Sequence, residues 1–342
     1  MADNTISNPQ SLDVVRSTRK DDTPTPGTKP SFIPRKVVIY YQTMTVSLRD
    51  LAVAYLVQKW LQMEVITHLI VGCFHLGREG YMHLNDHTPD HETFKVLWQD
   101  VQVLQQRGLK VMAMLGGACP GSFSCLDDDD HFQECYKTLY DMIVKYGFDG
   151  IDLDVEEPMS QDGIGRLIDR LRADFGPEFI ITLAPVATAL QGQAHLSGFS
   201  YLELERGRAD KINWYNTQFY NGWGSIETTE DYEKIMEMGW EPSRVIPTLL
   251  THSSNGTGGY VQFDRLKVIL TELRLTYVRF GGVAGWEYFN SDPSGQNAPY
   301  HWSVLVGRAL GLIPDITEGP FRSGLFSRDF YREICSFSGC IA

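Results

Sequence analysis

Strand-like segments and helical patterns alternate along most of this chain, and this alternation constrains its fold more than any other feature. Within 91–106, for example, Phe94, Leu97 and Val101 recur at the spacing of one helix face. Similar helical patterns cover 131–146, 162–175, 229–238, 261–280 and 302–310. The strand-like segments are 36–42, 65–75, 109–115, 150–156, 179–184, 212–220, 245–250 and 282–288. Strands that alternate with helices in this way form a parallel sheet with helices packed against it.

Eight such units predict an α/β fold of the (β/α)8 type, a single-domain TIM barrel. The main alternative is an open doubly wound sheet, which usually carries a glycine-rich phosphate loop after a strand. Gly116-Gly117-Ala118 has neither the spacing nor the lysine of such a loop. We also expect no inserted α+β domain before the last strand, because the predicted helix 261–280 uses most of the connection 251–281.

The two ends of the chain differ from the predicted barrel, which we assign to residues 34–312. Residues 1–33 are rich in Ser, Thr, Pro, Asp and Asn, a composition typical of a flexible tail. Residues 313–342 follow the last predicted helix and contain the aromatic residues Phe321, Phe326, Phe330, Tyr331 and Phe337. We predict that this C-terminal tail packs on or near the barrel.

The charge of the chain limits its partners. Its 43 acidic and 30 basic residues give a formal net charge of −13. Nucleic acids and anionic membranes are bound by clustered Lys and Arg, so we expect neither as a partner. No apolar run is long enough to cross a membrane, and residues 1–36 lack the apolar segment of a secretory signal. We therefore expect a cytoplasmic protein, although a secreted protein whose signal had been removed would look the same.

One predicted strand, 150–156, carries an unusual acidic face. Successive side chains on a strand point to opposite faces, so Asp152, Asp154 and Glu156 line one face. The opposite face is apolar, as in a strand packed against helices: Ile151, Leu153 and Val155. A solvated edge strand would need a polar opposite face. Buried carboxylates are costly unless they are paired, protonated or functional, and we therefore predict a functional site here.

The position of Glu156 is typical of a catalytic acid. It ends the fourth predicted strand, and barrel enzymes carry their active sites at the C-terminal strand ends. A carboxylic acid beside a carboxylate suggests glycoside hydrolysis, in which an acid protonates the leaving oxygen. Asp154 would lie only about 6–7 Å from Glu156 along the strand. That separation is too short for the usual pair of an inverting enzyme and favours a substrate-assisted route.

These residues resemble the signature of a known family. Asp149-x-x-Asp152-x-Asp154-x-Glu156 is similar to the motif of glycoside hydrolase family 18, which contains chitinases and endo-β-N-acetylglucosaminidases. Gly116-Gly117 resembles the Ser-x-Gly-Gly motif after strand three, although Met114 stands at the serine position. Over roughly 36–312 the chain is most similar to fungal endo-β-N-acetylglucosaminidases of the endo T type, in stretches that include 67–71, 83–86, 120–123, 158–161, 172–176, 214–220 and 285–291.

The resemblance implies a retaining mechanism without a metal or cofactor. Glu156 would protonate the bond between two N-acetylglucosamine units, while the 2-acetamido oxygen of the substrate attacks the anomeric carbon to give an oxazolinium ion. Asp154 would hydrogen-bond the acetamide N–H, and Asp152 would share a proton with it because two adjacent like charges do not both ionise. Glu156 would then activate water.

The resemblance also implies which residues bind substrate. Gln218 and Tyr220 share strand parity and would bond the acetamide oxygen, and Trp286 would form an apolar floor. Tyr40 would join that wall, since Tyr41 has the opposite parity. The matched motifs add Asn221 and Gly117. Plainer interpretations are barrel core for Trp286 and a polar layer of the barrel filling for Gln218 and Tyr220.

Two acidic features favour structural roles. The run 127–130 lacks the spacing of an EF-hand calcium loop, so we interpret it as a solvated acidic loop that stabilises a helix N-terminus. We expect Asp149 to be a structural turn or cap residue rather than a catalytic one.

Three functions remain open from the sequence. The first is an endo-β-N-acetylglucosaminidase that cuts the N,N'-diacetylchitobiose core of N-glycans or glycoproteins, acting as a monomer. The second is a chitinase that cuts linear chitin, and the third is a non-catalytic lectin on the same barrel. The lectin usually lacks the acid, whereas Glu156 is present. Without an inserted domain the cleft should be open and shallow, which favours a branched glycan over a linear polymer.

Overall fold

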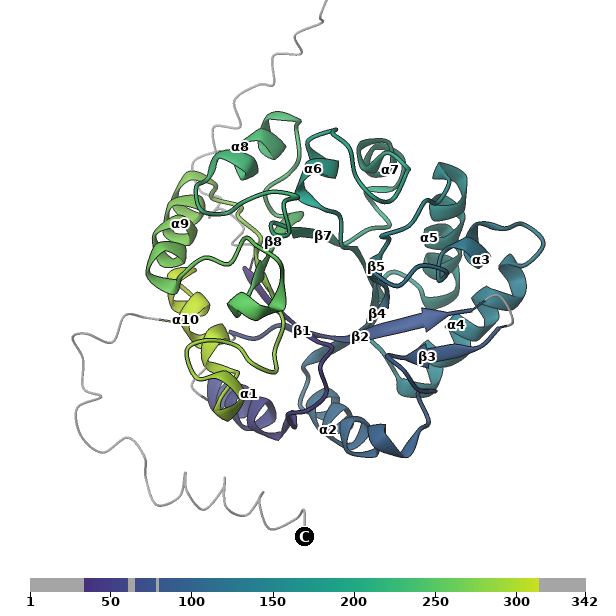
Figure 1. The fold of residues 1–342 in the computed structure, drawn as a ribbon, viewed down its shortest axis with the longest axis horizontal. Helices are drawn as coiled ribbons and strands as arrows, with labels where there is room; N and C mark the ends of the chain where they lie inside the picture. Colours follow the sequence, from purple (N-terminus) through teal and green to yellow (C-terminus); the bar gives the residue numbers. More distant parts are fainter. Residues whose placement is uncertain (1–33, 61–64, 78–79, 314–342) are drawn as a thin grey trace, which may run out of the picture. The chain divides into compact units, whose positions relative to one another are not determined.

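The computed structural model describes residues 34–60, 65–77 and 80–313. Eight parallel strands close into a barrel, because β1 pairs with β9 on one side and with β2 on the other. Figure 1 looks along this barrel, with the strands as an inner ring and the helices outside it. The predicted TIM barrel is confirmed.

One strand does not belong to the parallel ring. β3 pairs antiparallel with the end of β2, and Figure 1 shows this pair extending outward from the ring. The strands are β1 (Lys36–Tyr41), β2 (His68–Leu76), β3 (Met82–Leu84), β4 (Lys110–Gly116), β5 (Gly150–Asp154), β6 (Ile180–Leu183), β7 (Trp214–Gln218), β8 (Val245–Leu250) and β9 (Gly282–Trp286).

Six predicted helices are present within a few residues of their expected bounds: α2 (Lys95–Gln106), α4 (Phe132–Tyr146), α5 (Gln161–Phe175), α8 (Glu230–Glu237), α9 (Phe263–Thr276) and α10 (His301–Ala309). Among the described residues, four α-helices were not predicted: α1 (Arg49–Trp60), α3 (Ser124–Asp127), α6 (Ala187–Leu190) and α7 (Tyr201–Arg208). In α1 the apolar residues surround the helix instead of forming a stripe, so that Val53 is exposed while Leu51 is buried. α3 and α6 have four residues each, too few to show a helical period, and α7 buries only Tyr201 and Leu204, which makes a weak pattern.

Three predicted strands end two residues earlier than expected, and each end lies at the candidate site. β5 stops at Asp154, β7 at Gln218 and β9 at Trp286. The correction matters for Glu156, which lies two residues beyond its strand instead of ending it. The alternation of apolar and acidic residues continues through Val155, which is buried, although strand pairing has already stopped.

Apolar side chains form two layers, one outside the ring of strands and one inside it. Ile151 and Leu153 belong to the layer between strands and helices, as predicted. Inside the barrel, Tyr40, Met114 and Trp214 pack in a second, smaller cluster. Each fully buried large apolar side chain contributes about 1.5–3 kcal/mol, so the barrel wall is a stable support for the polar groups at its mouth.

The connections add no further domain to the described barrel. Only residues 251–281 link β8 to β9, and α9 takes up most of them. Ile313 is buried against the barrel, while the rest of the predicted tails, 1–33 and 314–342, lies outside the described residues. Among the described helices, none has both the length and the apolar character needed to cross a membrane.

Candidate active site

A cavity of about 310 Å³ opens at the C-terminal ends of the strands. Seven of the nine predicted site residues line it: Gly117, Asp154, Glu156, Gln218, Tyr220, Asn221 and Trp286. The remaining two, Asp152 and Tyr40, are buried in the barrel and are joined to each other by a hydrogen bond. The strands therefore bring all nine residues to one end of the barrel.

Asp152 is fully buried and accepts three hydrogen bonds from three strands. Tyr40 Oη donates from β1 at 2.7 Å. Thr182 Oγ1 donates from β6 at 2.5 Å, and Asn216 Nδ2 donates from β7 at 3.0 Å. Burial raises the pKa of Asp152, while these bonds oppose the rise because they favour the charged form. The carboxyl group is thus fixed in position by its donors.

Gln218 connects the other two carboxyl groups. Its Nε2 donates to Asp154 Oδ1 at 3.1 Å and to Glu156 Oε1 at 3.2 Å, and also reaches the Ala184 carbonyl at 3.0 Å. Asp154 and Glu156 therefore share one donor atom, although Glu156 lies outside the strand. Gln218 stands beside both carboxyl groups in the lining of the cavity.

Burial and like charge control the protonation of these groups. Burial raises the pKa of Glu156 above its usual range, against the opposing hydrogen bond from Gln218. The pKa of Asp154 is raised further, by burial and by the negative charges of Glu156 and Asp152. Negative charges this close together disfavour full ionisation of the cluster. A protonated carboxylic acid in the pocket is what general acid catalysis requires.

Aromatic side chains form one wall of the cavity. Trp286, the last residue of β9, is half-buried, and its ring centroid lies 5.5 Å from that of Tyr40. Tyr41 faces the opposite way, and its hydroxyl donates to the Val46 carbonyl, as the strand parity predicted. Burial and the charges of Asp154 and Glu156 raise the pKa of Tyr220 well above its usual value, so its hydroxyl stays protonated as a donor.

Gly117 and Asn221 shape the cavity through the backbone. Gly117 has φ +93°, and its N–H donates to the Asp154 carbonyl at 2.9 Å. Asn221 has φ +57°, and its Oδ1 accepts the Thr257 N–H at 2.7 Å. Asn221 therefore holds the loop after β8 while lining the cavity. Met114, at the serine position of the motif, is buried and lines the cavity, with its sulfur 4.0 Å from Cys73 Sγ.

Several residues of the site were missed by the sequence reasoning. Thr182 and Asn216 hold Asp152; both carry polar groups on barrel strands, and Asn216 shares the parity of Gln218, which could have revealed it. Glu287 is buried and accepts the backbone N–H groups of Gln42 and Thr43 at 2.9 and 2.7 Å. It ties the loop after β1 to the end of β9, next to Trp286. No sequence pattern predicts a contact between segments so far apart in the chain.

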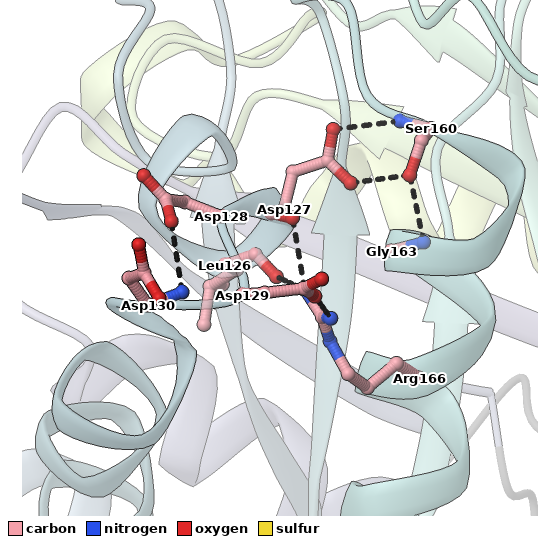
Figure 2. A network of polar contacts seen from close by, with 8 residues as sticks. All are labelled: Leu126, Asp127, Asp128, Asp129, Asp130, Ser160, Gly163 and Arg166. Carbon is pink, nitrogen blue, oxygen red and sulfur yellow. Dashed lines mark hydrogen bonds and ion pairs between the residues drawn. The ribbon is translucent and has the colours of Figure 1, made fainter.

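The acidic run 127–130 is more than a solvated loop. Figure 2 shows Asp127 accepting the N–H and hydroxyl of Ser160, and Asp129 contacting Arg166. Asp149 lies at the other end of the barrel, where it accepts the Val111 N–H at 2.9 Å, in keeping with a structural role. Within the described ranges, no group of three or more His, Cys, Asp or Glu side chains is arranged to hold a metal ion.

A larger groove of about 670 Å³ adjoins the cavity and shares His75 and Cys119 with it. Its rim includes Tyr81, which is 51% exposed and lies 5.1 Å from the ring of His83. The remaining lining residues are Leu76, Gly77, Asn85, Asp86, Pro120, Gly121, Ser122 and Ser124. An exposed aromatic ring beside hydroxyl, amide and carboxyl groups suits a surface that binds a polar ligand.

A (β/α)8 barrel with a cluster of protonatable carboxyl groups at its C-terminal end defines a glycoside hydrolase of the barrel type. Residues 36–244 match the family profile of the glycosyl hydrolases family 18, and the chain belongs to this family.

Two solved structures are similar to the chain over almost their whole length. A fungal endo-β-N-acetylglucosaminidase of this family is 44% identical, with 81% of this chain and 98% of that chain covered and a TM-score of 0.74. The chitinase ChiC from Aspergillus fumigatus is 46% identical, with 81% and 100% covered and a TM-score of 0.71. Chitinase 1 of Rhizopus niveus is 25% identical over 76% of this chain, which spans 55% of that protein.

Proposed function

We propose that this chain is a retaining endo-β-N-acetylglucosaminidase that hydrolyses the β-1,4 bond in the N,N'-diacetylchitobiose core of N-glycans. The proposed substrate is a free N-glycan or a glycoprotein that carries this core. The observation that carries the proposal is the wide groove beside the catalytic cavity, together with the absence of an inserted domain between β8 and β9 in the described barrel. A branched glycan needs such lateral space, whereas a single-file polymer does not.

The proposed mechanism uses the protonation states described above. Glu156, whose pKa is raised by burial, gives its proton to the glycosidic oxygen as the bond breaks. The carbonyl oxygen of the substrate's own 2-acetamido group attacks the anomeric carbon from the opposite face and forms an oxazolinium ion. Asp154 accepts a hydrogen bond from the acetamide N–H and stabilises the developing positive charge.

The second half of the mechanism returns the enzyme to its starting state. Glu156, now a carboxylate, takes a proton from a water molecule that attacks the anomeric carbon and opens the oxazolinium ring. Two inversions give net retention of configuration. Tyr220 and Gln218 orient the acetamide group, and Trp286 lies under the sugar ring. Asp152, fixed by Tyr40, Thr182 and Asn216, helps to raise the pKa of Asp154 through its negative charge.

A chitinase is the second candidate, because ChiC from Aspergillus fumigatus is as similar to this chain as the endo-β-N-acetylglucosaminidase. Both substrates present the same bond to Glu156, so the cavity itself does not distinguish them. A glycan-binding lectin on this barrel is a weaker candidate, since Glu156, Asp154 and the pocket that surrounds them are present.

Denatured high-mannose ribonuclease and colloidal chitin test these alternatives side by side. We expect the wild-type protein to shorten the ribonuclease to a form that bears one N-acetylglucosamine, and Glu156→Gln to leave it unchanged. Loss of the acid should lower the rate by at least about 10²-fold. Sugar release from chitin alone would establish the chitinase instead. Binding without cleavage of either substrate would support the lectin.

A further inference from the structure

Two carboxylates outside the cavity join the loop that carries Glu156 to the loop that forms the facing wall. The acid loop, residues 155–160, follows β5. The wall loop, residues 117–131, follows β4 and supplies Gly117, Ala118 and Cys119 to the cavity. We propose that Glu157 and Asp127 are positioning residues, which set the location of Glu156 relative to this wall. The inference rests on the proposed role of Glu156 as the acid.

Glu157 reaches from the acid loop to the wall loop. Its Oε2 accepts the Gly121 N–H at 2.8 Å, and its Oε1 accepts the Phe123 N–H at 2.6 Å. Hydrogen bonds between a carboxylate and backbone N–H groups are among the stronger ones in proteins. Glu157 does not line the cavity, whereas the adjacent Glu156 does. The two neighbouring acids therefore face different partners, and anchoring the second fixes the backbone of the first.

Asp127 makes the reciprocal contact from the wall loop. Its Oδ2 accepts the Ser160 N–H at 3.0 Å, and its Oδ1 accepts the Ser160 hydroxyl at 2.5 Å. Ser160 is also the N-cap of α5, because its Oγ accepts the Gly163 N–H (Figure 2). A Cβ at Gly163 would lie 1.9 Å from Asp127 Oδ1, so this close approach requires glycine there.

The wall loop is rigid enough to act as an anchor. Phe123, Cys125 and Leu126 are almost completely buried in the outer apolar layer. From α5, Arg166 donates to the carbonyls of Leu126 and Asp127 at 3.0 and 2.9 Å. The hydrogen bonds of Glu157 and Asp127 form a clamp between the two loops. This clamp joins the acid loop to a well-packed part of the barrel and not to a solvated segment.

A third element holds the acid loop from the other side. Ser197 Oγ donates to the Val155 carbonyl at 2.7 Å, and the Met159 N–H donates to the Ser197 carbonyl at 2.9 Å. Along the chain, Glu156 lies between Val155, which Ser197 holds, and Glu157, which the wall loop holds. Because it has left the strand, its position depends on loop contacts. A misplacement of about 1 Å at a reacting group can cost roughly 10²-fold in rate.

The test compares two carboxylates at opposite ends of the pair formed by β4 and β5: Glu157 at the C-terminal end and Asp149 at the N-terminal end. In Glu157→Gln the side chain keeps one acceptor oxygen for two N–H donors, so one bond is lost. Asp149→Asn makes the same change at the far end, where Asp149 accepts the Val111 N–H and the Lys110 ammonium group. Asp127→Ala opens the clamp from the wall loop. Each variant is assayed on the substrate that the wild-type protein cuts, whether glycoprotein or chitin.

We expect Glu157→Gln and Asp127→Ala to lower kcat by about 10–100-fold with KM nearly unchanged. Asp149→Asn should lower the melting temperature without this loss of kcat. Backbone hydrogen exchange should become faster in 117–131 for Glu157→Gln and in 155–160 for Asp127→Ala, a result that does not require activity. Wild-type kcat in Glu157→Gln, an equal loss in Asp149→Asn, or unchanged exchange in both loops would overturn the proposal.

Discussion

At the scale of single residues, the structure places the carboxyl group of Asp154 where burial disfavours its ionised form. Asp154 is buried, and its pKa is raised well above the usual value by burial and by Glu156 and Asp152. A raised folded-state pKa contributes stability that is complete below the ordinary carboxyl pKa and is lost as pH rises through the folded value. The catalytic arrangement therefore weakens the fold at neutral pH.

Asp154→Asn should restore the stability that the buried carboxyl group costs at neutral pH, while it removes activity. Asparagine keeps the oxygen that accepts from Gln218 Nε2, but it carries no charge at any pH. We expect the variant to match the wild-type melting temperature near pH 4 and to exceed it increasingly toward pH 8. The gain should be about 2–4 °C for each kcal/mol relieved. Thermal melts across this pH range check the prediction, with the exposed Asp210→Asn as control. A gain that is constant with pH, or present only in acid, would contradict it.

Gln218 should control the pH dependence of the reaction. Its Nε2 donates to Glu156 and favours the carboxylate, which lowers the pKa of Glu156. Gln218→Leu removes this donor, so the pKa of Glu156 should rise and the acid should remain protonated to higher pH. We expect the alkaline limb of kcat/KM to move upward in pH, while kcat falls by about 10²-fold because a donor at the reacting group is lost.

The measurement for Gln218 is a pH–rate profile on the cleaved substrate. Gln133→Leu, which changes an exposed glutamine on α4, should leave the profile of the wild-type protein unchanged. An alkaline limb that stays in place, or one that moves to lower pH, would show that Gln218 does not act on Glu156 in this way.

At the scale of elements, the sequence predicted strands better than the loops that follow them. Period-two alternation placed Asp152 and Asp154 inside the barrel, and Ile151 and Leu153 outside, as the structure shows. The same rule extended the strand to Glu156, because alternation carries no signal for the residue at which pairing stops. Parity depends only on neighbours along the chain, whereas strand ends depend on partners across the sheet.

Loop contacts could not be predicted because they join segments with no shared pattern. Nothing local relates Glu157 to Gly121, or Glu287 to Thr43. The first pair meets because β4 pairs with β5, and the second because β9 pairs with β1. The acidic run 127–130 illustrates the same limit. Charge and spacing predicted a solvated loop, but Asp127 bonds Ser160 because the loops after β4 and β5 are neighbours in the ring.

At the scale of the whole molecule, the proposed function assigns the choice of substrate to the space beside the cavity at the barrel mouth. On the proposed function, the carboxyl cluster acts on a bond that chitin and the N-glycan core have in common. Discrimination must therefore come from surfaces that only one substrate reaches. The groove between the β2–β3 extension and the wall loop is the larger of the two spaces, at about 670 Å³ against about 310 Å³ for the cavity.

Tyr81 is the residue through which this groove should act. Its ring lies so close over Gly77 that a Cβ there would approach it to 2.2 Å, so the ring rests on backbone while half of the side chain stays exposed. Such a supported ring can stack on a sugar of a branched arm. We expect Tyr81→Ala to lower kcat/KM on high-mannose glycoprotein by about three- to tenfold, the value of one aromatic contact.

The Tyr81 prediction is tested by comparing cleavage of a branched substrate with cleavage of a linear one. Cleavage of a short linear chito-oligosaccharide, which occupies the cavity without branches, should change little in Tyr81→Ala. Tyr140→Ala removes a partly exposed tyrosine from α4 and should affect neither substrate. Because the two substrates share the bond that Glu156 protonates, a loss confined to the glycoprotein assigns the groove to the branched arm. An equal loss on both would instead place Tyr81 in general support of the cavity, and a loss on the linear substrate alone would favour the chitinase.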